Sequence, residues 1–387
     1  MFSANVGSST LKNSYEAGKE AANLAAKDLN DIKIAFLYSS VEHDQKELLK
    51  GVKEVLKDAP VIGNTSFTGV ITPEGFISGE TFASMMVFSG DDLAVGVAGI
   101  PKASSARETG QMLAKLALKN SGKLKAPNYF YMVAPPGEEE FYLKGISDIV
   151  GRVPFFGGSA ADNSIEGKWE LFTSDGSFAD GLAVAFFYND RPFANKYTGA
   201  YKETTNSGII TKTSGNRTLV EIDGEPAIKK YASWVSKDPE SLLGGNLLVE
   251  TICAPLGVKD RLGELIAIRH PMFGNDDYSM NIGSNLSVNT AVIQMECSVD
   301  DLIDSVETTL NELKEKLCTE AAAFHLVHCG GRRAGIGDRI NEVYDKVKNA
   351  IGDTPFIMEF TFGEYGFEDD GNNTCGGLML SFTAFGK

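Results

Sequence analysis

Cysteine is scarce in this chain, and long apolar runs are missing from it. Five cysteines occur among 387 residues, an odd number with no CxxC pair. Such a set argues against a disulfide framework or a zinc ribbon and predicts reduced thiols in the cytoplasm. The longest apolar stretches, such as residues 181–188, are much shorter than the roughly 20 residues that a membrane-spanning helix needs. The N-terminal segment shows no secretory signal pattern, so we expect a soluble, cytoplasmic protein.

Basic residues are also in deficit, because 36 Lys and Arg face 52 Asp and Glu, which gives a formal net charge of −16. Proteins that bind nucleic acid or anionic membranes through charge alone need a surplus of cations, so we expect neither nucleic-acid binding nor membrane insertion. At roughly 100–200 residues per domain, the length predicts two or three domains. Glycine is abundant, with 41 residues, and indicates many tight turns.

One pattern occurs three times along the chain. Each copy has a buried strand, a loop of small residues, a helix, a strand led by proline, a further loop and a closing strand. The strands of the three copies fall in residues 32–40, 60–69 and 82–90, then 128–137, 154–163 and 181–190, then 321–331, 355–366 and 376–386. Repetition of this kind indicates that one structural unit is built three times.

The helix of each copy is indicated by apolar residues at helical spacing. In the third copy, the apolar stripe from Ile336 to Ile351 predicts one helix. The strands before the helices are nearly continuous apolar runs, typical of strands covered on both faces. A strand–helix–strand crossover gives a parallel pair, and the closing strand is near enough to pair antiparallel. The predicted fold class is therefore α/β, with repeated β-α-β-β units that form mixed sheets covered by helices.

The pattern changes between the second and third copies. Residues 196–224 and 246–296 read as strands with glycine-led turns, and a helix with a break near Pro239 separates them. We place the main boundary at this break. The sequence thus predicts an N-terminal domain of residues 1–235 and a C-terminal domain of residues 236–387.

Several short motifs occur in a fixed order along the chain. They are AGKEAA, IAFLYSS, VIGNTSFTGVI and FFGGSAADN, followed by CAPLGV, AIRHP, HCGGR and FGEYG. Their order and spacing resemble the FIST family, whose N- and C-terminal domains occur in signal-transduction proteins. The resemblance covers nearly the whole chain and implies an intracellular sensory domain that binds a small, amino-acid-like ligand. Because this chain has no room for a kinase or methyl-accepting module, we expect a stand-alone binder that works with a signalling partner protein.

A candidate ligand site follows the first strand of the third copy. Cys329, Gly330, Gly331, Arg332 and Arg333 lie between that strand and a helix. Unpaired N–H groups at a helix start, glycine backbone and an arginine that can clamp a carboxylate together predict an anion site. The resemblance favours Cys329 and Arg332 as its matched pair. The alternative is that the glycines serve only the turn and the arginines face water.

Glu364, in the FGEYG turn, follows an apolar strand and is expected to face this loop. A zwitterion would then place its carboxylate on Arg332 and its ammonium on Glu364. The alternative is an internal Glu–Arg pair without a ligand. Asn372, Asn373 and Thr374 are predicted to add neutral hydrogen bonds to the same pocket, although asparagine is also common in turns.

Two other functions stay open from the sequence. A thiol at a helix start has its thiolate favoured, so Cys329 is a candidate nucleophile for acyl or thiol transfer. The family resemblance also leaves a haem-based gas sensor, with His270 or His328 as the iron ligand. His325 and His328 face opposite sides of a strand, so we predict no metal shared between them. The leading prediction is a sensory protein that binds a small ligand without a cofactor and without catalysis.

Overall fold

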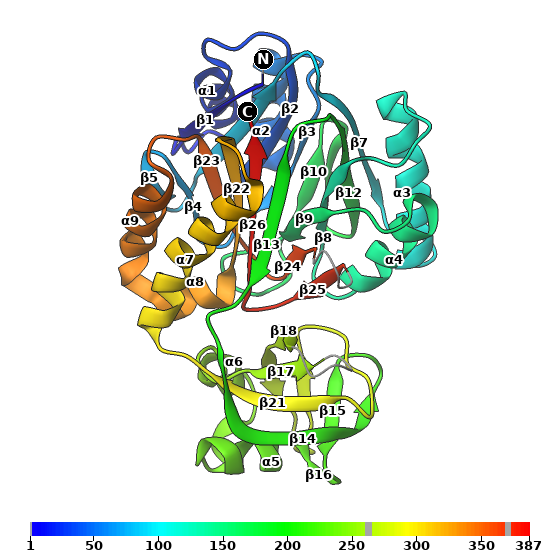
Figure 1. The fold of residues 1–387 in the computed structure, drawn as a ribbon, viewed down its shortest axis with the longest axis vertical. Coiled ribbons are helices and arrows are strands. Elements are labelled where there is room, and N and C mark those ends of the chain that lie inside the picture. The colour runs from blue at the N-terminus through cyan, green and yellow to red at the C-terminus, as the bar shows by residue number, and fades with distance from the viewer. Residues whose placement is uncertain (1, 260–264, 368–372) are drawn as a thin grey trace.

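The molecule has two parts of unequal size, joined by two stretches of chain (Figure 1). The computed structural model describes residues 2–259, 265–367 and 373–387. Three sheets and most helices form the larger part, and a fourth sheet with short helices forms the smaller part. The chain enters the smaller part after β13 (Phe193–Thr198) and returns from it into α7 (Val299–Leu317). The smaller part is therefore an insertion within the larger one.

The first and second sheets come largely from the N-terminal half of the chain. In spatial order the first contains β1 (Ser3–Ser9), β6 (Ala83–Ser89), β2 (Ile32–Ser39), β3 (Val61–Thr65), β10 (Leu171–Thr173) and β11 (Gly176–Phe178). The second contains β7 (Ala94–Pro101), β12 (Gly181–Tyr188), β8 (Tyr129–Ala134), β9 (Phe155–Ser159), β24 (Glu364–Gly366) and β25 (Thr374–Gly376). In each sheet one parallel pair, β2 with β3 or β8 with β9, lies among antiparallel neighbours.

The third sheet draws strands from both halves of the chain. Its order is β13, β26 (Leu380–Gly386), β22 (Ala321–Cys329), β23 (Phe356–Thr361), β4 (Gly69–Thr72) and β5 (Gly75–Ser78). Its hydrogen-bonded strands thus come from both sides of residue 235. The domain boundary expected at that residue stays a prediction.

These three sheets share one connectivity. The orders are β1-β6-β2-β3, β7-β12-β8-β9 and β13-β26-β22-β23. In each of them the first strand of the unit lies beside its last strand, and the two strands of the parallel pair follow. Each unit also sends a hairpin to the edge of another: β4-β5 joins the third sheet, β10-β11 the first and β24-β25 the second. The predicted fold class, repeated β-α-β-β units that form mixed sheets covered by helices, is confirmed.

The smaller part is built around strand β14 (Lys202–Ser214), which pairs with both β15 and β21. Its remaining elements are β15 (Thr218–Ile222), β16 (Glu225–Pro226), α5 (Ala227–Val235), η1 (Pro239–Leu242), α6 (Asn246–Glu250), β17 (Leu256–Lys259), β18 (Leu265–Arg269), β19 (Pro271–Gly274), β20 (Met280–Ile282) and β21 (Ala291–Glu296). It has an apolar core of its own, around Ile210, Tyr231 and Met280.

The helices cover the outer faces of the three sheets. They are α1 (Ser14–Ala26) and α2 (Gln45–Leu56), α3 (Ala106–Ser121) and α4 (Glu139–Val150), and α7 with α8 (Gly330–Ile336) and α9 (Ile340–Ile351). The prediction of one helix from Ile336 to Ile351 is partly wrong, because α8 ends at Ile336 and a short 3-10 turn precedes α9. Gly337 has a φ of 60° at this break, a conformation that disfavours continuation of an α-helix.

Two of the helix pairs approach closely through glycine. A side chain on Gly18 would meet the Leu48 carbonyl oxygen at 2.1 Å, and one on Gly51 would meet the Tyr15 oxygen at 1.9 Å. The pair α3 and α4 has the same arrangement at Gly110 and Gly145. Since backbone atoms cannot move aside as a flexible side chain can, these positions require glycine.

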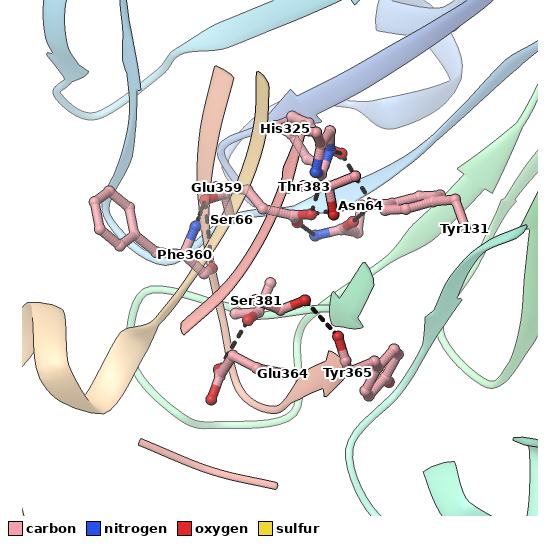
Figure 2. A network of polar contacts seen from close by, with 12 residues as sticks. Asn64, Ser66, Tyr131, His325, Glu359, Phe360, Glu364, Tyr365, Ser381 and Thr383 are labelled. Carbon is pink, nitrogen blue, oxygen red and sulfur yellow. Dashed lines mark hydrogen bonds and ion pairs between the residues drawn. The ribbon is translucent and has the colours of Figure 1, made fainter. Parts of the chain in front are cut away.

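The inner faces of the three sheets meet in one aromatic core that contains a buried polar network (Figure 2). The Tyr131 hydroxyl donates to Glu359 Oε1 at 3.1 Å and lies 2.9 Å from the Tyr38 hydroxyl. Asn64 Nδ2 donates to Glu359 Oε2 at 2.9 Å, and His325 Nε2 hydrogen-bonds the Tyr38 hydroxyl. These side chains come from β2, β3, β8, β22 and β23, so the network ties all three sheets together.

Burial governs the protonation of this network. It raises the pKa of the Glu359 carboxyl to about 7 and lowers the pKa of the His325 imidazole to about 3. Each shift favours the neutral form, because a charge is poorly solvated away from water. The core thus satisfies most of its hydrogen bonds, apart from the unused His325 Nδ1 among the described residues, while holding little net charge below neutral pH.

The close helix contact generates a first prediction. Gly51→Ala should lower the free energy of unfolding by about 1–3 kcal/mol, because the added methyl group collides with the backbone of α1. Gly245→Ala is the matched control, since no described atom lies within 4 Å of the added carbon. Urea denaturation of both variants measures the difference. Equal midpoints would show that α1 and α2 separate at little cost.

The buried carboxyl generates a second prediction. Between pH 4.5 and about 7 the native state keeps a Glu359 proton that the unfolded chain has lost, so this residue lowers stability as pH rises. The stability of the wild type relative to Glu359→Gln should fall by on the order of 3 kcal/mol across that window, at about 1.4 kcal/mol per pH unit. Denaturation curves at half-unit pH steps measure it. A constant difference would contradict a raised pKa.

Candidate functional site

The structure brings Cys329, Arg332 and Glu364 together beneath the smaller part of the molecule. Cys329 ends β22 and caps α8, Arg332 lies in the first turn of α8, and Glu364 begins β24. Cys329 is 4% exposed, and the other two side chains are 0% exposed. The three candidates therefore form one buried cluster, which we call the Arg332 cluster.

The sulfur of Cys329 is held by main-chain amides. Its Sγ accepts hydrogen bonds from Gly331 N at 3.3 Å and Leu378 N at 3.2 Å, and its thiol also hydrogen-bonds the Glu364 carboxyl. In this conformation the Gly331 amide at the helix start is already used by Cys329, so the expected anion site there stays a prediction. Burial raises the pKa of Cys329 well above that of a free thiol, which disfavours the expected thiolate.

Glu364 is the acidic member of the cluster. Its Oε1 accepts from the Thr361 hydroxyl and its Oε2 from Met379 N, both at 3.0 Å. Burial raises the pKa of this carboxyl to about 8, and the hydrogen bonds only partly oppose that shift. Glu364 is therefore largely protonated at neutral pH and supplies little negative charge.

Arg332 is the basic member of the cluster, and only some of its hydrogen-bond donors have partners. One terminal nitrogen, Nη2, donates to the Leu302 carbonyl at 2.9 Å and to Ser305 Oγ at 2.6 Å, both on α7. Its Nε and Nη1 have no hydrogen-bond partner in the described part of the chain. Within residues 2–259, 265–367 and 373–387, Arg332 makes no ion pair, with Glu364 or with any other carboxylate. A buried guanidinium with two unused donor atoms is thus the electrostatic centre of the site.

The other predicted residues lie at or beyond the edge of the cluster. Gly330 is closely packed against Phe362 and Thr361. Arg333 is directed elsewhere, since its Nη1 donates to the Gly337 carbonyl at 2.9 Å and its guanidinium stacks over Phe76.

The asparagine-rich segment contributes less than expected. Asn373 donates to the Val153 carbonyl at 2.9 Å rather than to the cluster. Thr374 lies opposite Gly366 in the β24–β25 pair, two positions from the pairing of Glu364 with Gly376. Asn372 lies outside the described residues.

Two tyrosines complete the cluster, although the sequence did not single them out. The Tyr197 ring packs against Gly366, and its buried hydroxyl has no partner among the described residues. Tyr197 lies within electrostatic range of both Glu364 and Arg269. The Tyr201 hydroxyl donates to the Ile252 carbonyl at 2.9 Å and lies near Arg332. Tyr197 lies near the end of β13 and Tyr201 follows that strand, where the chain leaves the larger part. This exit from the larger part is the sequence feature that could have indicated both residues.

Arg269, at the end of β18, brings a second guanidinium toward the cluster from the smaller part. Its Nε is buried without a partner in the described chain, and burial lowers its pKa. The neighbouring His270 closes the cluster, because its ring carbon lies 3.4 Å from where a side chain on Gly331 would begin. In the sequence, the AIRHP motif that carries these residues contributes to the family resemblance and offers His270 as a candidate haem ligand, but nothing singles out Arg269.

The two parts of the molecule are also joined by a charged contact beside this site. Arg217 Nη2 bonds to Glu139 and, at 2.7 Å, to Glu140 Oε2. The Asn285 amide donates to Glu140 Oε1 at 2.9 Å. Glu139 and Glu140 begin α4, whereas Arg217 and Asn285 belong to the smaller part. The junction therefore includes the ion pairs of Arg217 with both glutamates.

The haem alternative rests on histidines that are buried and bound to the main chain. His270 Nε2 lies 3.2 Å from the Leu248 carbonyl oxygen, and His328 Nδ1 lies 3.0 Å from the Cys329 oxygen. Burial lowers the pKa of His270 to about 4. In the part of the chain that the structure describes, no group of three or more His, Cys, Asp or Glu residues is placed to hold a metal ion.

Surface hollows occur away from the Arg332 cluster. One of about 690 Å³ lies on the smaller part and is lined by residues that include Thr218, Phe273 and Asp277. Another of about 360 Å³ lies between the ends of α7 and α9. The Arg332 cluster itself is closed in this conformation. Among the described helices, none has both the length and the apolar character needed to cross a membrane.

Comparisons with known proteins identify the family. The FIST N domain model matches residues 33–225, and the FIST C domain model matches residues 227–366. No curated protein sequence matches the chain. Among solved structures, cyanuric acid hydrolase from A. caulinodans aligns over 100% of both chains at 10% identity, with a TM-score of 0.40. PurLQS from Thermotoga maritima aligns over 99% of this chain and 72% of its own, at 9% identity and a TM-score of 0.26. Because the two family models together cover most of its length, this protein belongs to the FIST family of sensory domains.

Proposed function

We propose that this protein is a sensory binder of a small carboxylate, most simply an amino acid, and that the ligand binds at the Arg332 cluster. The observation that carries the proposal is the buried Arg332 guanidinium, whose Nε and Nη1 find no partner among the described residues. A buried charge without a counter-charge is costly, and an unused donor adds to that cost. A bound carboxylate would remove both costs.

The geometry of Arg332 suits this ligand class. Its Nη2 is anchored to α7 through Leu302 and Ser305, which fixes the orientation of the guanidinium plane. Two donors on a fixed plane match the two oxygens of a carboxylate, whereas a lysine would offer only a point charge. The unsatisfied Tyr197 hydroxyl adds a neutral donor near Glu364.

Glu364 is the proposed partner of a ligand ammonium group. In the free protein this carboxyl favours its protonated form, since burial raises its pKa to about 8. An arriving ammonium would stabilise the carboxylate by direct charge pairing. Arg332 and Glu364 would then address opposite ends of a zwitterion, with the Cys329 thiol as a hydrogen-bond donor to Glu364.

Entry of a ligand would require the smaller part to move. The cluster is covered by Tyr201, Arg269 and His270, which belong to that part or to its connection. Arg217 and the two α4 glutamates hold the junction next to it. Such a movement would change the surface offered to a signalling partner protein in the cytoplasm, and that change would report the bound ligand.

The proposal predicts a loss of binding in an arginine variant. Amino acids and small carboxylates should raise the melting temperature of the wild type, and Arg332→Lys should weaken that binding by about tenfold or more because the two-donor clamp is lost. Arg333→Lys is the matched control, since Arg333 points toward Phe76 and Gly337. Thermal-shift titration measures both. A shift that survives unchanged in Arg332→Lys would place the ligand elsewhere.

The acidic member generates a prediction on pH. Because Glu364 must lose its proton to pair with an ammonium, affinity for an amino acid should rise about tenfold per unit from pH 6.5 to about 8 and then level off. Affinity for a plain carboxylate without an amine should stay nearly constant over that range. In Glu364→Gln the rise should vanish. Calorimetric titration at several pH values measures this, and an equal rise for both ligand types would argue against the ammonium role.

A further inference from the structure

Two cysteines outside the Arg332 cluster lie directly opposite each other. In the antiparallel pair of β17 and β21, Leu256 lies opposite Gln294 and Val258 opposite Val292. The same register continues beyond both strands, where Met295 N donates to the Pro255 oxygen at 2.8 Å. It ends at Cys253 and Cys297, where the Cys297 amide donates to the Cys253 oxygen at 3.0 Å. The two residues are thus a cross-strand pair.

This placement meets the requirements of a disulfide. Directly opposed residues joined by a backbone hydrogen bond have Cα atoms about 5.5 Å apart, and disulfides form at about 4.4–6.8 Å. Both cysteines are free, and their side chains are already in hydrogen-bond contact with each other. Each is only partly buried, so a small oxidant can reach them.

The contact also favours the thiolate form of one of the two cysteines. The hydrogen bond from the Cys297 thiol lowers the pKa of Cys253 to about 7 and raises the pKa of Cys297 itself. The nearby Arg332 charge partly offsets the rise at Cys297. Two thiols that share a proton in this way titrate as a pair, with one thiolate formed early.

We propose that Cys253 and Cys297 are a site of reversible oxidation that reacts with hydroperoxides. The Cys253 thiolate attacks a peroxide oxygen, the O–O bond breaks, and the departing hydroxide takes a proton to become water. The Cys297 sulfur, as it loses its thiol proton, attacks the sulfenic acid sulfur left on Cys253 and forms the S–S bond, and the departing hydroxide takes up that proton to become a second water. Two thiols and one hydrogen peroxide thus give one disulfide and two waters.

The position of the pair gives this oxidation a structural consequence. Cys297 is immediately followed by Ser298, which caps α7, so it lies where the chain returns to the larger part. Cys253 follows Ile252, whose carbonyl accepts from Tyr201 on the other connecting stretch. A disulfide here would fix the smaller part at its junction, next to Arg332. This inference stands independently of the proposed ligand, because it concerns different side chains.

Peptide mapping of the oxidised protein tests the proposal. The full chain is treated with hydrogen peroxide at a small molar excess, denatured, alkylated and digested. Alkylatable thiols should fall from five to three, a peptide linked through Cys253 and Cys297 should appear, and dithiothreitol should restore all five. The wild type alone decides this result, so it does not depend on the folding of a variant.

Three variants sharpen the experiment. The linked peptide should be absent from Cys253→Ser and Cys297→Ala and present in Cys318→Ser, which removes an exposed thiol elsewhere. In Cys297→Ala, alkylation of Cys253 in the folded protein at pH 7 should slow by about fivefold to tenfold, since its hydrogen-bond donor is lost. Five thiols remaining after peroxide, sulfinic acid on Cys253 with Cys297 still free, or linkage between chains through Cys318 would each overturn the proposal.

Discussion

A guanidinium buried without a counter-charge is the constraint on which this account of the protein depends. Arg332 is fully enclosed, yet two of its donor nitrogens find no partner in the described part of the chain. The carboxyl near it, Glu364, is driven toward its neutral form by the same burial. A fold seldom retains so unfavourable an arrangement without use, because removing water from an unpaired charge costs several kcal/mol. Binding of an anion, as we propose, would provide that use.

The architecture explains how such a site can exist. Three sheets of the same connectivity exchange hairpins, and their inner faces close around an aromatic core. Among the described residues, the hydrogen bonds of the central network around Glu359 are nearly complete, apart from the unused Nδ1 of His325. We therefore assign this network to the stability of the larger part and not to ligand binding. The Arg332 cluster lies instead where the third unit meets the inserted smaller part. Several of the unpartnered buried polar atoms of the described residues, on Tyr197, Arg269 and Arg332, lie at this junction.

Much of the fold could be predicted from the sequence, because the spacing of apolar residues and the order of the helices and strands are local signals. The apolar strands, the helices and the proline-led strands gave the β-α-β-β units, and the strand-end loop gave Cys329 and Arg332. Glu364 followed from its position after the third Pro-led strand. The exchange of hairpins could not be predicted, since no local pattern states which sheet edge a hairpin joins. The raised pKa of Cys329 could not be predicted either, because its burial and the nearby Glu364 carboxyl depend on segments that are distant in the sequence. Tyr197, Tyr201 and Arg269 were missed for the same reason.

The most direct test of the central claim is a crystal structure of the protein grown with the amino acids or carboxylates that raise its melting temperature. We expect density for a carboxylate within hydrogen-bond distance of Arg332 Nε and Nη1, with the smaller part displaced relative to the larger one. Density at those two atoms that is only ordered water or protein, with the ligand bound at another place, would contradict the proposed site.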